Sequence, residues 1–395
     1  MAALMAAALA TGSKVYYNFF FLLLVMVVFS AASVVWMLFS VRVSMKGVKP
    51  RVSRGEKLMT IVSVQHSCVL PAGSVRVTLN VPGSGSSLQE ISVNAPPFAK
   101  KNYRNVVRCP HRGYYDVGIA RITVSDIFSL FEISRKSKKK LLRVEVYPQA
   151  VDVPCMQLKA SDMGPEFRSR ATEDAASPSD IRAWQDGDEL KKVHWKLSLR
   201  RQELMVRTFE ESARPDTLII PDLSEITALN DQKLTMEDCI CEAALSAAKA
   251  QLEEGFPVRM PLISRRPQEL SEKTVIGIGS FTDALMRVNF DSPYPYEQVL
   301  ALMLQRMQRT GGCILITGKL SSRTVDMALR MQKSGMQVKL IWVTDARRSD
   351  TLEMLERMKM SGVIVEQADP WLSGGYAAAK PEEQAGLDEE TIFDI

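Results

Sequence analysis

The stretch CILITGKLSSRTVDMALRMQKSGMQVKLIWVTD, from Cys313 to Asp345, joins two short apolar runs through one amphipathic run. The runs CILIT and VKLIWV are nearly continuous in apolar residues, which is typical of strands covered on both faces of a sheet. Between them, apolar side chains recur every three or four residues up to Gly335, a pattern that predicts a helix with a glycine stop. A strand, a helix and a second strand in this order predict a parallel pair joined by a crossover helix.

The same alternation extends in both directions from this stretch. It predicts an α/β domain with a mainly parallel sheet, flanked by helices, over residues 213–370. The predicted strands are TLIIPDL, FPVRMPLI, KTVIGIG, CILITG, QVKLIWVTD and GVIVEQA. The predicted helices are TMEDCICEAALSAAKAQLEEG, YEQVLALMLQRMQRTGG, SSRTVDMALRMQKSG and SDTLEMLERMKMSG. Residues 371–395 are acidic and rich in glycine and alanine, so we expect a disordered tail there.

Residues 50–150 follow a different pattern, in which short runs alternate polar and apolar residues, as in SVRVTLNVPG and VGIARITVSD. Period-two runs rich in valine and isoleucine, separated by turn residues, predict antiparallel strands. Five or more of them in about 100 residues indicate a small β-sandwich domain. The basic run RKSKKK, from Arg135 to Lys140, is expected to be a solvated hairpin tip, and contact with anionic lipid is the alternative.

The N-terminal region contains a candidate membrane anchor. Residues 15–41 carry no charged side chain, and the 21 residues from Phe19 to Phe39 are almost all apolar. About 20 such residues cross a bilayer as a helix, so we predict a transmembrane helix over residues 15–41. A signal peptide cleaved near Ser30–Ser33 is the alternative, but the apolar run continues to Phe39 and no basic region precedes it.

The charges that flank this helix predict its orientation. Only Lys14 precedes it closely, whereas six basic residues follow it, namely Arg42, Lys46, Lys49, Arg51, Arg54 and Lys57. Because basic residues collect on the cytoplasmic side, everything after Val41 is expected in the cytoplasm, with the chain in the cell membrane. Residues 1–14 are too short to cross a bilayer alone, and one interpretation is that they are the remnant of an earlier helix.

The bulk composition excludes little else. The net charge of +5 on 395 residues is too small to indicate a nucleic-acid partner. The six cysteines are scattered rather than arranged as a disulfide framework, so we expect them to be reduced and buried, as suits a cytoplasmic location.

Residues 151–212 form an irregular, highly charged linker that ends in the stretch DGDELKKVHWKLSLRRQELMVR, from Asp186 to Arg207. Three stretches of the chain resemble the bacterial domain-of-unknown-function-58 family: RGYYDVGIARITVSDIFSLF, VEVYP and this last stretch. The residues that carry the third resemblance are Arg182, Gly187, Asp188, His194, Trp195, Lys196, Ser198, Arg200, Leu204, Val206, Arg207 and Glu210. The sequence departs from the family pattern at Lys191, where arginine is expected, and at Trp184, where tyrosine is expected.

The resemblance implies a membrane-tethered protein whose α/β domain is similar to a von Willebrand factor A domain. It also implies partnership with a AAA+ ATPase of the MoxR type. The family usually has two N-terminal helices, so by this resemblance residues 1–14 are expected to be what remains of the first.

A catalytic role for the signature stretch is the first chemical hypothesis. His194 would be the base, oriented by Asp186 or Asp188. In a strand, His194, Lys196 and Ser198 would share one face, with no nucleophile or second histidine beside them. We therefore favour a structural or partner-binding role, in which Asp188 forms ion pairs with nearby basic residues.

A metal site at the end of the first α/β strand is the second hypothesis. The run PDLSEI provides Asp222 and Ser224, but Ile226 stands where the pattern D-x-S-x-S of an A domain requires serine. Thr317, or Thr344 with Asp345, follow later strands and would lie at the same sheet edge. These hard oxygen ligands suit Mg²⁺, although turn capping by Asp222 and Ser224 also explains the pattern.

Together these features predict a non-enzymatic, membrane-tethered interaction or scaffold protein. The alternative is a metal-dependent enzyme or a chaperone-like adaptor that uses a degraded Mg²⁺ site at Asp222 and Ser224.

Overall fold

In the computed structural model the chain forms two compact units, and the boundary between them in the sequence lies between Tyr147 and Pro148. The structure describes residues 6, 10, 14–69, 73–83, 87–137, 140–151, 155–156, 180–185, 193–208, 215–305, 310–344 and 349–370. The predicted disordered tail at 371–395, most of the N-terminal segment 1–14 and most of the linker 151–212 lie outside these residues.

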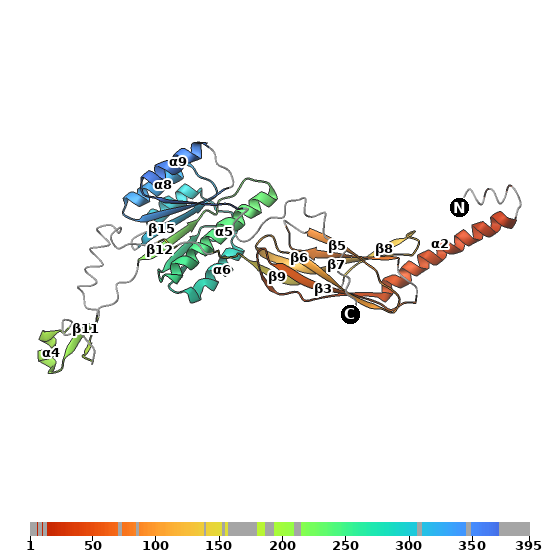
Figure 1. Ribbon diagram of the computed structural model, residues 1–395, viewed down its shortest axis with the longest axis horizontal. Coiled ribbons are helices and arrows are strands. Elements are labelled where there is room, and N and C mark those ends of the chain that lie inside the picture. The colour runs from red at the N-terminus through yellow and green to blue at the C-terminus, as the bar shows by residue number, and fades with distance from the viewer. Residues whose placement is uncertain are drawn as a thin grey trace. The chain divides into compact units, whose positions relative to one another are not determined.

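The first unit begins with one long helix, α2 (Lys14–Ser40), which is long and apolar enough to cross a membrane. Strand β1 (Val41–Lys46) follows it without an intervening loop. The sequence predicted neither this strand nor so abrupt a change of structure. Figure 1 shows α2 projecting from one end of the β-rich part of the unit.

Two sheets make up the rest of this unit, which we call the β unit. One is antiparallel, in the order β1-β3-β6, with β3 at Lys57–His66 and β6 at Lys100–Arg108. The other has the order β2-β9-β7-β4-β5, with β8 also paired to β7. Its strands are β2 (Arg51–Ser53), β4 (Ser74–Val81), β5 (Ser87–Val93), β7 (Gly113–Ser125), β8 (Glu132–Lys136) and β9 (Leu142–Tyr147).

Both sheets contribute side chains to one apolar core. Val62 and Val64 of β3 pack in the same cluster as Val77 and Leu79 of β4, all of them buried. Met37 of α2 belongs to this cluster as well, so the end of the helix is part of the core of the β unit. Alternating inward residues on facing strands are what the period-two pattern of the sequence predicts.

A polar contact also holds α2 to the β unit. The buried Ser30 hydroxyl donates a hydrogen bond to the carboxylate of Asp126, which is fully buried in the turn between β7 and β8. The same carboxylate accepts hydrogen bonds from the backbone N–H groups of Phe128 (3.1 Å) and Phe131 (2.9 Å). Asp126 therefore orders the turn and contacts the helix with one side chain.

The second unit, which we call the α/β unit, contains a sheet that has six strands among the residues the structure describes. Their order is β14-β13-β12-β15-β16-β17. All pairs are parallel except β13 with β14, which is antiparallel. The strands are β12 (Asp216–Pro221), β13 (Val258–Leu262), β14 (Gln268–Glu272), β15 (Thr310–Thr317), β16 (Gln337–Val343) and β17 (Ile364–Ala368).

Helices cover both faces of this sheet (Figure 1). One core lies under α5 (Asn230–Glu253) and α6 (Ile278–Arg287) and contains Ile219. The opposite core contains Leu218 and Ile220. It lies under three helices, which are α7 (Tyr296–Leu304), α8 (Ser322–Lys333) and α9 (Ser349–Met360). Because neighbouring residues of β12 enter opposite cores, the strand is buried on both faces, as its continuous apolar run predicts.

The strand predicted at KTVIGIG is wrong. Val275–Gly277 form a short 3-10 helix, and α6 begins at Ile278. Ile276 is 95% exposed, so this apolar run has no sheet to bury it. Strand β14 lies before it instead, at the edge of the sheet, and its polar sequence QELSE gave no apolar signal.

The two-sided burial of β12 leads to a stability prediction. Replacing Ile220 with alanine removes a fully buried side chain and should destabilise the α/β unit by about 2–5 kcal/mol. Urea unfolding should therefore show a lower midpoint than for the unchanged protein. Ile276→Ala, at a side chain that is 95% exposed, is the matched control and should change stability by no more than about 0.5 kcal/mol. Equal midpoints for the two variants would contradict the packing described.

Candidate functional site

The signature stretch folds into a small element that we call the signature module, made of residues 180–185 and 193–208. Strand β10 (Asp180–Ala183) pairs with β11 (Met205–Thr208) in antiparallel register, and the short helix α4 (Trp195–Arg201) lies between them in the chain. The Trp184 amide donates to the Leu204 carbonyl (2.7 Å), which continues the pairing beyond β10.

His194 starts α4 rather than acting as an isolated base. Its Nδ1 accepts a hydrogen bond from the Leu197 amide (3.2 Å), which is the geometry of an N-cap. In neutral imidazole the accepting nitrogen is the unprotonated one, so this bond assigns the ring proton to Nε2. The His194 amide donates to the Met205 carbonyl (2.8 Å), so the residue also attaches the helix to β11.

Ser198 is the second residue that attaches α4 to β11. Its buried hydroxyl donates to the His194 carbonyl (3.0 Å) and accepts from the Met205 amide (2.9 Å). One hydroxyl therefore joins the middle of α4 to the first residue of β11. The helix ends at Arg201, and the following C-cap residue, Gln202, adopts the left-handed conformation (φ 58°).

The strand predicted for His194, Lys196 and Ser198 is wrong, because these residues lie at the cap and within α4. They do not share one strand face. Ser198 is buried, whereas Trp195 and Leu199 are 59% and 79% exposed. These two apolar side chains lie four residues apart, on one side of the helix. Lys196, Arg200 and Arg201 of the same helix are also exposed.

Several predicted signature residues cannot be placed at a site. Gly187, Asp188 and Glu210 lie outside the described residues, as does Lys191. The ion pairs expected for Asp188 therefore stay a prediction. The backbones of Arg182 and Arg207 lie in β10 and β11, where Ile181 pairs with Arg207 and Arg182 with Val206.

A second cluster forms at the carboxyl ends of β12 and β15, and we call it the Asp222 cluster. The buried Asp222 accepts hydrogen bonds from the Ser224 hydroxyl (2.6 Å) and amide (3.0 Å) on Oδ1. Its Oδ2 accepts from the buried Thr317 hydroxyl (2.7 Å), although Thr317 is 95 residues further along the chain. Because parallel strands β12 and β15 are neighbours, their ends bring these residues together.

Tyr296 supports this cluster from α7, and the sequence gave no signal for it. Its hydroxyl donates to the Ile220 carbonyl (2.7 Å) and accepts from the Ile316 amide (3.2 Å), so it bridges β12 and β15 just before their ends. Burial, and next the negative charge of Asp222, raise the pKa of Tyr296 well above its usual range. Tyr296 is therefore a neutral residue whose hydroxyl joins the two strands by hydrogen bonds.

The oxygens of Asp222, Ser224 and Thr317 are of the hard type that Mg²⁺ prefers. Both carboxylate oxygens are already hydrogen-bonded to the neighbouring hydroxyls, so the cluster is satisfied without an ion. Asp345 lies outside the described residues, and among those described no three His, Cys, Asp or Glu side chains form a metal-binding group. The hydrogen bond from the Ser224 backbone amide to the Asp222 carboxylate is also the arrangement expected for turn capping.

The buried hydroxyl of Ser198 leads to a prediction about the signature module. Ser198→Ala leaves the Met205 amide without its acceptor, which should cost the module about 1–3 kcal/mol. Hydrogen exchange at that amide should become faster by roughly tenfold for each 1.4 kcal/mol lost. Leu199→Ala, at an exposed neighbour on the same helix, is the control and should leave the exchange rate unchanged. An unchanged rate in Ser198→Ala would show that the hydroxyl does not hold α4 to β11.

The solved structures to which the chain is similar match it only loosely. The CARDB domain of a protein from Pyrococcus furiosus, solved with two metal ions, is 18% identical and covers 27% of this chain and 86% of its own, with a TM-score of 0.21. Cwp6 from Clostridium difficile is 9% identical over 84% of this chain and 53% of its own (TM-score 0.19). Spo0M from Bacillus subtilis, a sporulation control protein, is 12% identical over 37% and 58% (TM-score 0.17).

Among curated proteins, none matches the sequence. A family model described as "Protein of unknown function DUF58" matches residues 180–353. The matched segment contains the signature module, the Asp222 cluster and strands β12 to β16. The match over residues 180–353 supports the resemblance to this family that the sequence motifs indicate.

Proposed function

We propose that this protein is a non-enzymatic, membrane-tethered interaction subunit, whose signature module binds a partner protein. The observation that carries the proposal is the exposure of Trp195 (59%) and Leu199 (79%) on a helix that Ser198 and His194 hold rigidly. Tryptophan is enriched among the residues that contribute most to protein–protein binding. A fixed, exposed apolar pair is therefore better suited to recognition than to chemistry.

The partner that we propose is a AAA+ ATPase of the MoxR type. This proposal rests on the family resemblance, which associates such membrane-tethered proteins with that class of ATPase. Lys196 and Arg200 beside the apolar pair favour a partner surface that combines an apolar pocket with acidic side chains.

In the same proposal, α2 spans the cell membrane as an anchor. The basic residues after α2 support a cytoplasmic location for both units. The α/β unit acts as a von Willebrand A-like domain. Its mainly parallel sheet, covered by helices on both faces, supports this comparison.

A second function follows from the Asp222 cluster, in which Mg²⁺ bound by Asp222, Ser224 and Thr317 completes a contact with a partner or a metal-dependent active site. What supports it is the convergence of three oxygen-bearing side chains at the carboxyl edge of the sheet, where ligands of α/β proteins bind. A single carboxylate and the isoleucine at position 226 count against it.

The partner-binding proposal predicts that Trp195→Ala weakens the complex. Purified full-length protein in detergent should bind a purified MoxR-type ATPase, and loss of a hot-spot tryptophan should cost about 2 kcal/mol or more, roughly 30-fold in Kd. Ile276→Ala, at an apolar side chain exposed elsewhere in the α/β unit, is the matched control and should leave Kd unchanged. If Trp195→Ala and Ile276→Ala bind equally well, the signature module is not the contact surface.

The role of the Asp222 cluster is tested by the metal dependence of the same complex. If the interaction subunit needs no ion, Kd should be the same with Mg²⁺ and with a chelator, and Asp222→Asn should bind like the unchanged protein. Asn is chosen because it keeps the shape of the side chain but removes the charge that an ion requires. Loss of binding both on chelation and in Asp222→Asn would favour the metal-dependent alternative.

A further inference from the structure

Three loops at one end of the β unit expose large apolar side chains. The loop after β3 exposes Val69 (71%), the loop before β6 exposes Phe98 (70%), and the turn between β7 and β8 exposes Phe128 (51%). With the other members of the β7–β8 turn they form a set that we call the apolar rim, namely Val69, Phe98, Ile127, Phe128, Leu130 and Phe131.

The strand registers place these loops at the end of the β unit where α2 enters. The first residue after α2, Val41, pairs with His66, the last residue of β3. The start of β6 pairs with the same end of β3, through Lys100 and Gln65. In the other sheet, Ser74 at the start of β4 pairs with Ser125, next to the β7–β8 turn.

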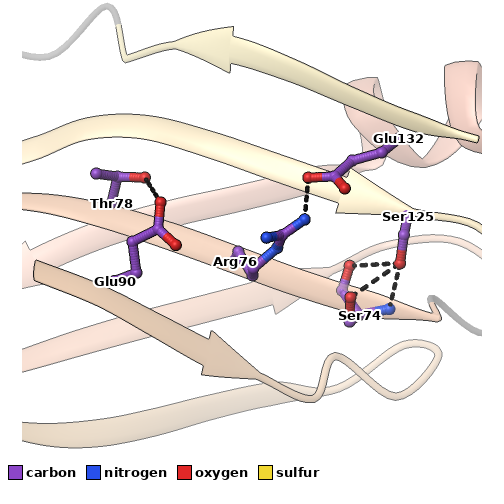
Figure 2. Close-up of polar contacts among 6 residues, drawn as sticks. All are labelled: Ser74, Arg76, Thr78, Glu90, Ser125 and Glu132. Atoms are coloured by element: carbon purple, nitrogen blue, oxygen red, sulfur yellow. Dashed lines mark hydrogen bonds and ion pairs between the residues drawn. The ribbon is translucent and has the colours of Figure 1, made fainter.

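Two of these loops, the β3–β4 loop and the β7–β8 turn, are also packed together at this end. A Cβ atom added at Gly73 would lie 2.0 Å from the carbonyl oxygen of Asp126, so only glycine permits the β3–β4 loop to approach the turn this closely. The Gly73 amide donates to the Ser125 carbonyl (3.2 Å). Figure 2 shows Ser74 and Ser125 joined by hydrogen bonds just before the turn. The rim is therefore carried by an ordered framework.

The position of α2 sets the level of the rim relative to the bilayer. Ser30, which donates to Asp126 in the turn, lies ten residues before the last residue of α2. At 1.5 Å per residue, the turn lies alongside the helix roughly 15 Å from its end. This position is inside the apolar run Phe19–Phe39, which is the part of the helix that lipid is expected to surround.

The opposite side of the same helical segment remains apolar and open. Ser30, Ser33, Val34 and Met37 face the β unit and are buried. In contrast, Val35, Trp36 and Phe39 are exposed, with exposed fractions of 46–75%. These three side chains line an open apolar surface together with Ala31 and Ala32. Lipid that covers this side of α2 must reach the level at which the β7–β8 turn lies.

Charges near the rim suit the headgroups of anionic lipids. Besides Arg76, which pairs with Glu132, four basic side chains lie in the described parts of the segments 40–42, 66–76, 93–101 and 125–135, namely Arg42, Lys100, Lys101 and Arg135. The two acidic side chains of these segments are buried or paired. Asp126 is buried against Ser30, and Glu132 pairs with Arg76 (Figure 2). Basic residues that surround exposed apolar ones are typical of surfaces that enter the membrane interface.

From this arrangement we propose that the apolar rim docks into the same bilayer that α2 crosses, so that the β unit lies partly in the membrane interface. This inference rests on the proposed role of α2 as a membrane anchor, and it adds a second membrane contact made by three separate loops.

The test uses single fluorescent labels in the full-length protein, reconstituted into vesicles of phosphatidylcholine and phosphatidylglycerol with or without brominated acyl chains. An environment-sensitive dye is attached to Phe128→Cys or Phe98→Cys, two different loops, in a Cys155→Ser background. Among the native thiols, burial, and next the charge of Glu56, raise the pKa of Cys109 to about 11, and burial raises that of Cys313. Such thiols react slowly with the dye at neutral pH, since the thiolate is the reactive form.

Two more positions make the outcomes distinguishable. Leu24→Cys, on the exposed side of α2, reports whether the anchor is in the bilayer. Met59→Cys, which is 71% exposed on β3, lies seven residues from His66 and so about 23 Å from the rim. We expect bromine quenching at positions 24, 98 and 128 to be several-fold greater than at position 59.

Each other result overturns a defined part of the proposal. One such result is strong quenching at position 24 together with quenching at positions 98 and 128 that is no greater than at position 59. It would show that α2 is an anchor but that the rim stays in water. No quenching at position 24 would contradict the anchor itself, and with it the proposed membrane-tethered function.

Discussion

The direct connection between α2 and β1 constrains the whole N-terminal unit. The helix ends at Ser40 and the strand begins at Val41, so no linker separates an apolar helix from a folded sheet. The Ser30–Asp126 hydrogen bond and the burial of Met37 in the core extend this connection along the last turns of the helix. Whatever medium surrounds the outer side of α2 therefore also reaches the loops at that end of the β unit.

Most of the fold could be predicted from residue periodicity. Runs such as TLIIPDL and QVKLIWV are apolar on both faces because helices cover both faces of the sheet, and this burial appears directly in the sequence. The edge strand β14 carries no such signal, although β17 at the other edge does. Strand β14 is polar, and the run at Ile276 is apolar but exposed, so the pattern around residues 268–279 predicted the wrong element.

The candidate sites were predictable only in part. Asp222 and Ser224 are two residues apart, and a strand end followed by Asp is visible in the sequence. Thr317 could be suggested from the parallel order of strands, but Tyr296 enters from a helix on one face and no spacing indicates it. In the signature module, closely spaced charged and apolar residues resembled a strand, whereas the cap formed by His194 and the bonds of Ser198 select a helix.

Across the described residues of both candidate sites and of the β7–β8 turn, buried polar groups are largely satisfied within the protein. Asp126 and Asp222 have their carboxylates hydrogen-bonded, and Ser198 both donates and accepts. A satisfied polar group gains little from a new ligand, because binding would only exchange one hydrogen bond for another. Exposed apolar groups gain free energy whenever they are covered. The surfaces with most to gain are therefore the Trp195–Leu199 pair and the apolar rim, and this difference is the physical basis of the two binding proposals.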